Sequence, residues 1–129
     1  KRIFPMPRIE QCEVKKDDRG LLVELFKIPH VGQVFFSVSK PGVTRGNHYH
    51  TRKIERFCVI EGNAKIRLRN RETGEIKEYA VSGETPEIID MPIRWTHNIT
   101  NTGDMEMKLI VWINKVFNPE DPDTYHEEV

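Results

Sequence analysis

Short segments of alternating apolar and polar residues, separated by turn residues, make up most of this sequence. The segments with a strand pattern are 21–28, 32–40, 55–62, 64–71, 76–81, 87–95, 96–100 and 105–117. They are rich in β-branched and aromatic residues, and no apolar pattern of helical period persists between them. Eight to ten short strands at regular spacing predict an all-β domain. A small barrel or jelly roll is favoured, because closing the sheet removes exposed edges.

The length of 129 residues suits one domain with a single hydrophobic core, which we expect to span 1–129. Within it, residues 1–18 are expected to form an extended N-terminal arm, and residues 118–129 an acidic C-terminal tail. The first residue is Lys1 rather than Met, which is consistent with a piece of a longer protein.

The charge balance narrows the classes of partner. Twenty basic and twenty acidic residues give a formal net charge of zero, which argues against nucleic acid or an anionic membrane as partner. The sequence has no apolar run of membrane-spanning length, no signal-peptide pattern and only two cysteines, Cys12 and Cys58. We therefore expect a cytoplasmic protein without a disulfide framework.

Three histidines and one glutamate form a candidate metal site. His48 and His50 are one residue apart and would share a face of a β-strand, and Glu55 begins the next apolar segment. His97 follows a Pro-containing turn further along the chain. Three imidazoles and one carboxylate suit Zn, Fe, Mn, Co or Ni.

The spacing of these residues resembles that of the cupin superfamily. The segment from Gly42 to Gly62 has the pattern Gly, five residues, His-x-His, four residues, Glu, six residues, Gly. The second cupin motif is matched by Pro92, His97 and Asn101, although Arg94 stands where that motif has Gly. The resemblance implies a cupin jelly roll, a double-stranded β-helix, with His48, His50, Glu55 and His97 as metal ligands.

The likeness is greater to the C-terminal cupin domains of CapF-type (WbjC-like) capsular polysaccharide enzymes. It rests on KPGVTRGNHYHTRKIERF, PIRWTHNITN and FNPEDPDTYHEEV, and extends from about Arg19 to Val129. The resemblance implies a zinc-dependent epimerisation at C3 of a UDP-4-keto-6-deoxy-N-acetylhexosamine, followed by reduction by an NADPH-dependent reductase domain, upstream or separate. The present sequence has no GxGxxG dinucleotide-binding motif.

The epimerisation needs a base that removes a proton beside a ketone. Candidate bases on predicted strands or their ends are Tyr49, Lys53, Tyr79, Asp90 and Tyr125. Tyr49 would point away from the two flanking histidines. We therefore take Lys53, Asp90 and Tyr125 as the candidate catalytic residues.

The diphosphate of a UDP-sugar would need nearby cations, for which Arg45, Lys53 and Arg94 are the candidates. A homodimer is also expected, because cupins commonly dimerise. The apolar residues Cys58, Ile60 and Trp112 would face outward and could form the dimer surface.

Three alternatives remain open from the sequence. A cupin with three histidines, one glutamate and iron can be a dioxygenase. The domain could also be a non-catalytic sugar-binding or assembly module. Finally, the four side chains could act as hydrogen-bonding or acid–base groups without a metal.

Overall fold

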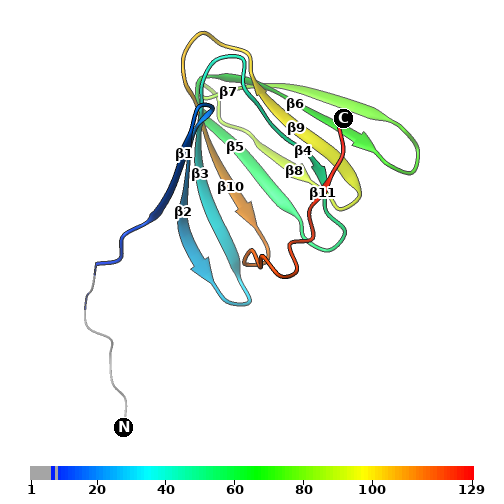
Figure 1. Cartoon of the computed structure of the whole chain (residues 1–129). Helices are drawn as coiled ribbons and strands as arrows, with labels where there is room; N and C mark the ends of the chain where they lie inside the picture. The colour runs from blue at the N-terminus through cyan, green and yellow to red at the C-terminus, as the bar shows by residue number, and fades with distance from the viewer. Residues whose placement is uncertain (1–6, 8) are drawn as a thin grey trace.

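The protein is a sandwich of two antiparallel β-sheets, as seen in a computed structural model that describes residues 7 and 9–129 (Figure 1). One sheet has the strand order β1-β2-β3-β10-β5-β8 and the other has the order β11-β4-β9-β6-β7. The strands are β1 (Glu13–Asp17), β2 (Gly20–Ile28), β3 (Gly32–Ser39), β4 (Thr44–Tyr49), β5 (Glu55–Glu61), β6 (Asn63–Asn70), β7 (Ile76–Ser82), β8 (Ile88–Met91), β9 (Trp95–Asn101), β10 (Met107–Ile113) and β11 (Tyr125–His126). The predicted all-β architecture is confirmed.

From β3 onward, the chain passes repeatedly between the two sheets. Strands β3, β5, β8 and β10 belong to the first sheet, while β4, β9 and β11 and the hairpin β6–β7 belong to the second. Such alternation pairs strands that are distant in sequence, for example β3 with β10 and β4 with β9. This winding is that of a jelly roll, which confirms the cupin-type fold expected from the sequence.

The hydrophobic core lies between the sheets and follows from the alternating pattern of the strands. Val59, Ile66 and Met107 are almost completely buried, whereas their sequence neighbours point outward. Complete burial of one such side chain stabilises the fold by about 1.5–3 kcal/mol.

Within the described residues, no helix is long and apolar enough to cross a membrane.

Several element boundaries differ from those predicted. The predicted arm over 1–18 contains β1, which pairs with β2, while residues 1–6 and 8 of that arm lie outside the described residues. The predicted strand 87–95 ends at Met91, because Pro92 has no amide hydrogen to continue the ladder. Arg94 then has a positive φ of 63° in the turn before β9.

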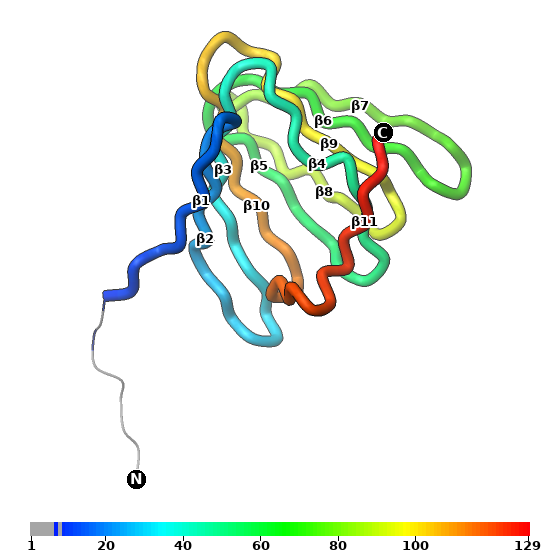
Figure 2. Tube along the Cα trace, viewed as in Figure 1, coloured from blue at the N-terminus to red at the C-terminus, as the bar shows by residue number. Residues whose placement is uncertain are grey.

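The predicted C-terminal tail is a strap that crosses the second sheet. After β10 the chain returns past the ends of the strands and runs beside β4, where Tyr125 and His126 pair with Tyr49 and His48 (Figure 2). The amide of Glu127 also donates to the carbonyl oxygen of Asn47. We call residues 118–129 the C-terminal strap.

Candidate metal centre

A β-bulge in β4 directs His48 toward the space between the sheets. The pairing of β4 with β9 is interrupted between Gly46 and His48, and resumes with His48 opposite His97. Gly46 and Asn47 have φ angles of 98° and 58°, a left-handed conformation that lets one extra residue fit into the strand. A side chain at Gly46 would place its Cβ 2.9 Å from the carbonyl oxygen of His97.

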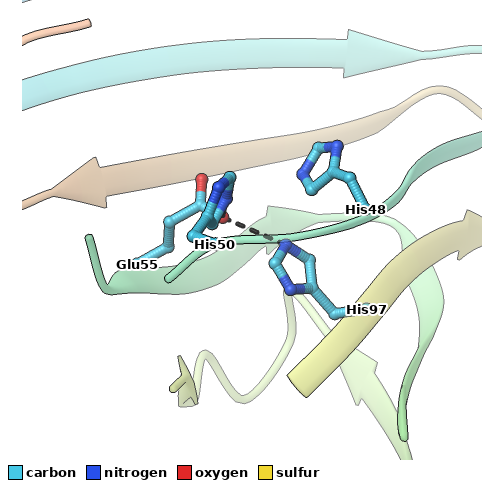
Figure 3. Close-up of side chains that lie close together, drawn as sticks. All are labelled: His48, His50, Glu55 and His97. Atoms are coloured by element: carbon cyan, nitrogen blue, oxygen red, sulfur yellow. Dashed lines mark hydrogen bonds and ion pairs between the residues drawn. The ribbon is translucent and has the colours of Figure 1, made fainter. Parts of the chain in front are cut away.

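Four side chains from both sheets converge on one point (Figure 3). His48, His50, Glu55 and His97 each offer one ligand atom, and these four atoms lie within 4.8 Å of one another. The distance from Glu55 Oε1 is 2.8 Å to His50 Nε2 and 3.0 Å to His97 Nε2. The structure therefore brings together the four residues predicted as metal ligands.

Hydrogen bonds on the far side of two rings set their tautomers. His50 Nδ1 lies 2.7 Å from the carbonyl oxygen of Asp123, and His97 Nδ1 lies 3.2 Å from that of Trp95. A carbonyl can only accept, so both Nδ1 atoms donate, and in the neutral rings each Nε2 carries the free lone pair. Histidines that bind metals usually donate their second N–H in this way.

The atoms that face the centre are thus hydrogen-bond acceptors. The lone pairs of His50 and His97 point at the Glu55 carboxylate, which can only accept when it is ionised. His97 Nε2 is buried and has no hydrogen-bond partner in the described part of the chain. Acceptors this close to one another are held together by a proton or by a metal cation between them, and a divalent metal ion fits three nitrogen ligands and one oxygen ligand.

The protonation states of the candidate ligands His48 and Glu55 suit metal binding. Burial, followed by the neighbouring His97, lowers the pKa of His48 to about 4. Burial alone would raise the pKa of Glu55, but a proton on the Nε2 atom of His50 or His97 donates to the carboxylate and holds this pKa well below its ordinary value. At neutral pH His48 is therefore neutral and Glu55 is ionised.

The C-terminal strap holds the loop between the ligands through Asp123, which is 6% exposed. One carboxylate oxygen accepts from the amide and the hydroxyl of Thr51, at 2.9 and 2.7 Å. The other accepts from the amides of Arg52 and Lys53, at 2.7 and 3.1 Å. Together with the carbonyl contact to His50, one residue of the strap positions both a ligand and the loop that leads to Glu55.

A second set of bonds fixes the end of the strap to the sheet. Glu127 accepts from the hydroxyl of Thr96 at 2.5 Å and from Arg71 Nε at 2.9 Å. Thr96 directly precedes His97 in β9. The strap is therefore anchored on both sides of the metal cluster.

A cavity of about 340 Å³ opens beside the cluster, between the two sheets. Its residues are Arg19, Leu22, Phe35, Ser37, Arg45, Gly46, His48, Glu55, Phe57, Ile99, Leu109 and Val111. Arg45 reaches across from β4 to β3, where Nε donates to Ser39 Oγ at 2.7 Å and Nη2 to the Val38 carbonyl at 3.3 Å. The cavity thus combines the candidate metal ligands, apolar walls and two guanidinium groups.

Among the residues predicted to bind substrate or to catalyse, Arg45 lines this cavity and the others lie elsewhere. Lys53 is buried in a separate hollow, with its Nζ 5.3 Å from the centre of the Phe117 ring. Asp90 lies on the outer face of the first sheet, where it accepts from Arg56 at 2.8 Å. These positions do not bring Lys53 or Asp90 to the cavity.

Tyr125 and Arg94 also point away from the cavity. Tyr125 is 46% exposed and stacks on Tyr49, with ring centres 5.1 Å apart. Arg94 is exposed in the turn before β9, and its amide donates to the His50 carbonyl at 2.8 Å. Their proposed roles in catalysis or substrate binding stay predictions.

Sequence reasoning missed Asp123 and Ser37, of which only Ser37 had a local signal. The amides that the Asp123 carboxylate caps lie 70–72 positions earlier in the chain, so no local pattern marks this residue. Ser37 occupies an inward position of β3, on a face that also carries Gln33, Phe35 and Ser39. A polar residue at such a position is an indication of a binding site.

Comparisons with known proteins agree with the fold and the site. Residues 15–125 match the family described as polysaccharide biosynthesis C-terminal domain. The chain is 47% identical over 109 residues to a UDP-2-acetamido-2,6-beta-L-arabino-hexul-4-ose reductase of Pseudomonas aeruginosa. That alignment covers 84% of this chain but only 29% of the reductase.

Two smaller relatives are matched over most of their length. The spore coat polysaccharide biosynthesis protein SpsL of Bacillus subtilis is 28% identical over 89% of this chain and 86% of that protein. The probable low-salt glycan biosynthesis epimerase Agl13 of Haloferax volcanii is 28% identical over 92% of this chain and 86% of that protein.

Solved structures show the same likeness to polysaccharide biosynthesis proteins and to the cupin fold. The capsular polysaccharide assembling protein CapF of Staphylococcus aureus is 47% identical with a TM-score of 0.89, over 92% of this chain and 35% of CapF. An oxalate decarboxylase of Lactobacillus farciminis has a TM-score of 0.68 at 18% identity, over 81% of this chain and 31% of the enzyme, a likeness of fold alone. The predicted resemblance to cupins, and to the CapF type in particular, is confirmed.

Proposed function

Because this chain belongs to the polysaccharide biosynthesis C-terminal domain family, we propose that it is a metal-dependent epimerase domain for nucleotide sugars. Its substrate would be a UDP-4-keto-6-deoxy-N-acetylhexosamine, and the reaction an inversion at C3. The observation that carries this proposal is the convergence of His48, His50, Glu55 and His97 at one end of a cavity that also contains arginines.

In this reaction a base takes the C3 proton and the electron pair of the C3–H bond moves toward the C4 ketone oxygen to give an enolate, to which a proton is returned on the opposite face of C3. Negative charge develops on the ketone oxygen and must be stabilised. A divalent metal ion at the cluster would supply a Lewis acid for that charge. We propose zinc for this ion, with His48, His50, Glu55 and His97 as its ligands.

The chain's own residues would orient the substrate in the cavity. Arg45 is held by Ser39 and by the Val38 carbonyl, so its guanidinium is already positioned to bind a phosphate oxygen. The apolar walls formed by Phe35 and Phe57 would exclude water from the reacting carbon. The sugar would therefore lie with C3 and C4 toward His48 and its diphosphate toward Arg45.

The proposed partner activity is a reductase that acts on the epimerised ketone. The P. aeruginosa relative is named as a reductase of a UDP-hexulose, and this chain spans 29% of its length. We propose that an NADPH-dependent reductase, fused or separate, uses the product of this domain, and that both act in the cytoplasm.

A homodimer is also proposed, through the outer face of the first sheet. Cross-strand pairing places Cys58, Ile110 and Trp112 on this face, and alternation along β5 adds Ile60, which is 43% exposed. An uncovered apolar sheet face of this kind favours association. Sedimentation of the wild type and of a variant with Ile60→Lys would test the dimer, which the substitution should dissociate.

The experiment for the main proposal follows the C3 proton by NMR in deuterated water. Metal-loaded protein should exchange the C3 proton of the UDP-4-keto sugar for deuterium, and chelator-treated protein should not. The Glu55→Gln variant keeps nearly the same side-chain shape but loses the charged ligand oxygen, so it should not exchange the C3 proton either. Binding of the sugar without any exchange would favour a binding module, and oxygen uptake with bound Fe(II) would favour a dioxygenase.

A further inference from the structure

Ser37 has a buried hydroxyl that makes no hydrogen bond within residues 7 and 9–129. The residue lies on β3, is 2% exposed, and lines the cavity beside the metal cluster. Its Oγ atom has no hydrogen-bond partner among the residues that the structure describes. A buried hydroxyl without a partner destabilises a protein by roughly 1–3 kcal/mol, and most buried polar groups in native proteins are therefore paired.

The neighbours of Ser37 make its lack of a partner more informative. Gln33, Ser37 and Ser39 lie on the same inward face of β3. Gln33 donates to Glu24 at 2.8 Å, and Ser39 accepts from Arg45 at 2.7 Å. Gln33 and Ser39 are thus hydrogen-bonded to other side chains, whereas Ser37 has no such bond in the part of the chain that the structure describes.

The residues opposite Ser37 on the two adjacent strands are Leu22 and Leu109. Both are apolar and both line the same cavity. An alanine at position 37 would fit this environment without an unpaired polar atom. Packing therefore gives no reason for a hydroxyl here.

The position of Ser37 in the cavity indicates what it would contact. Arg45 is anchored on Ser39, two residues along the strand from Ser37. His48 and Glu55 belong to the metal cluster and line the same cavity. A ligand that extends from Arg45 to the cluster would pass over the Ser37 hydroxyl and against the apolar side chain of Leu22.

We infer that Ser37 is a specificity-determining residue, whose hydroxyl bonds a polar substituent of the sugar ring while the apolar walls accept a deoxy carbon. The ligand class that fits is a nucleotide sugar with one apolar edge. This inference rests on the proposed function for the identity of the ligand. The unpaired hydroxyl itself does not depend on that proposal.

The test is the Ser37→Ala variant, in two measurements on the metal-loaded chain. Thermal unfolding without ligand should show an unchanged or higher Tm, because the unpaired hydroxyl is removed. The Kd for the UDP-4-keto-6-deoxy-N-acetylhexosamine, measured by calorimetry, should rise about 2–12-fold, the equivalent of one lost hydrogen bond of about 0.5–1.5 kcal/mol.

Ser82→Ala is the matched control, because Ser82 Oγ accepts from the Glu84 amide and lies outside the cavity. This variant should leave the Kd unchanged. An unchanged Kd in Ser37→Ala, or a Tm several degrees lower, would overturn the inference. Wild-type protein that binds the sugar without C3 exchange would refute the epimerase proposal, and the comparison of Kd values would still decide the role of Ser37.

Discussion

Replacing Asp123 by alanine should weaken both the fold and the metal site. The carboxylate accepts four hydrogen bonds, two from Thr51 and one each from the amides of Arg52 and Lys53. At about 0.5–1.5 kcal/mol each, and with water replacing part of the loss, Asp123→Ala should cost about 3 kcal/mol. For a chain of this size that corresponds to a Tm lower by about 12 °C.

The same substitution should lower metal affinity without touching a ligand. The loop from Thr51 to Lys53 joins His50 to Glu55, and the Asp123 carbonyl accepts from His50 Nδ1. Alanine keeps this main-chain carbonyl, but without the carboxylate the strap and the loop no longer hold it firmly against His50. Loss of the groups that orient a ligand commonly costs about 10–100-fold in metal affinity. Competition with a chromophoric chelator would measure this change.

Two further variants complete the experiment. Asp123→Asn keeps one carbonyl oxygen in the side chain and should give an intermediate Tm and affinity. Asp121→Ala removes an exposed ion pair with Arg52 and should change the stability by less than about 1 kcal/mol. Wild-type Tm and wild-type metal affinity in Asp123→Ala would refute the positioning role of the strap.

Three other predictions concern the cluster and the strap. Glu55→Gln should reduce metal affinity at least about 100-fold, because an amide is a poor replacement for a charged oxygen ligand. The control Glu61→Gln, at an exposed position, should leave the affinity unchanged, and equal metal affinities of the two variants would contradict the assignment of Glu55. Gly46→Ala should lower both Tm and metal affinity, because the added Cβ would meet the His97 carbonyl oxygen. The control is Gly74→Ala: Gly74 has a similar positive φ but open space around it, so this variant should lower the Tm alone. Burial raises the pKa of Asp123, but hydrogen bonds from Thr51, Arg52 and Lys53 outweigh burial and lower it, and hydrogen bonds from Arg71 and Thr96 lower the pKa of Glu127. Their stabilisation is therefore complete above about pH 5 and is lost as the pH falls through the lowered values. Urea denaturation at several pH values should show this loss, and Asp123→Asn should show a smaller one.

The strands and the ligand set could be predicted because both depend on local periodicity. Alternation identified the inward residues of β5 and β6, and the His-x-His spacing put His48 and His50 on the same side. Glu55 and His97 were candidates from their place at or near the start of later strands, and the motif spacing supported both. These features need only the direction in which a side chain leaves the strand.

The surroundings of the cluster could not be predicted, because they depend on contacts between distant parts of the chain. The main-chain carbonyl of Asp123 contacts His50 Nδ1 although the two residues are 73 positions apart, and a periodic pattern in the sequence cannot predict such a contact. Lys53 flanks the ligand strand in sequence and was a candidate for that reason, but in the fold it is buried against the Phe117 ring. Tyr125 looked like a candidate base within a distinctive motif, but strand pairing places it on Tyr49 outside the cavity.

The most direct test of the metal centre is X-ray absorption at the zinc edge of protein loaded with one equivalent of zinc. The structure predicts nitrogen and oxygen ligands only, at about 2.0–2.2 Å, with the scattering of three imidazole rings. The His97→Ala variant should show two. Sulfur scattering at about 2.3 Å, or fewer than three imidazoles in the wild type, would contradict the assignment of His48, His50, Glu55 and His97 as the ligands.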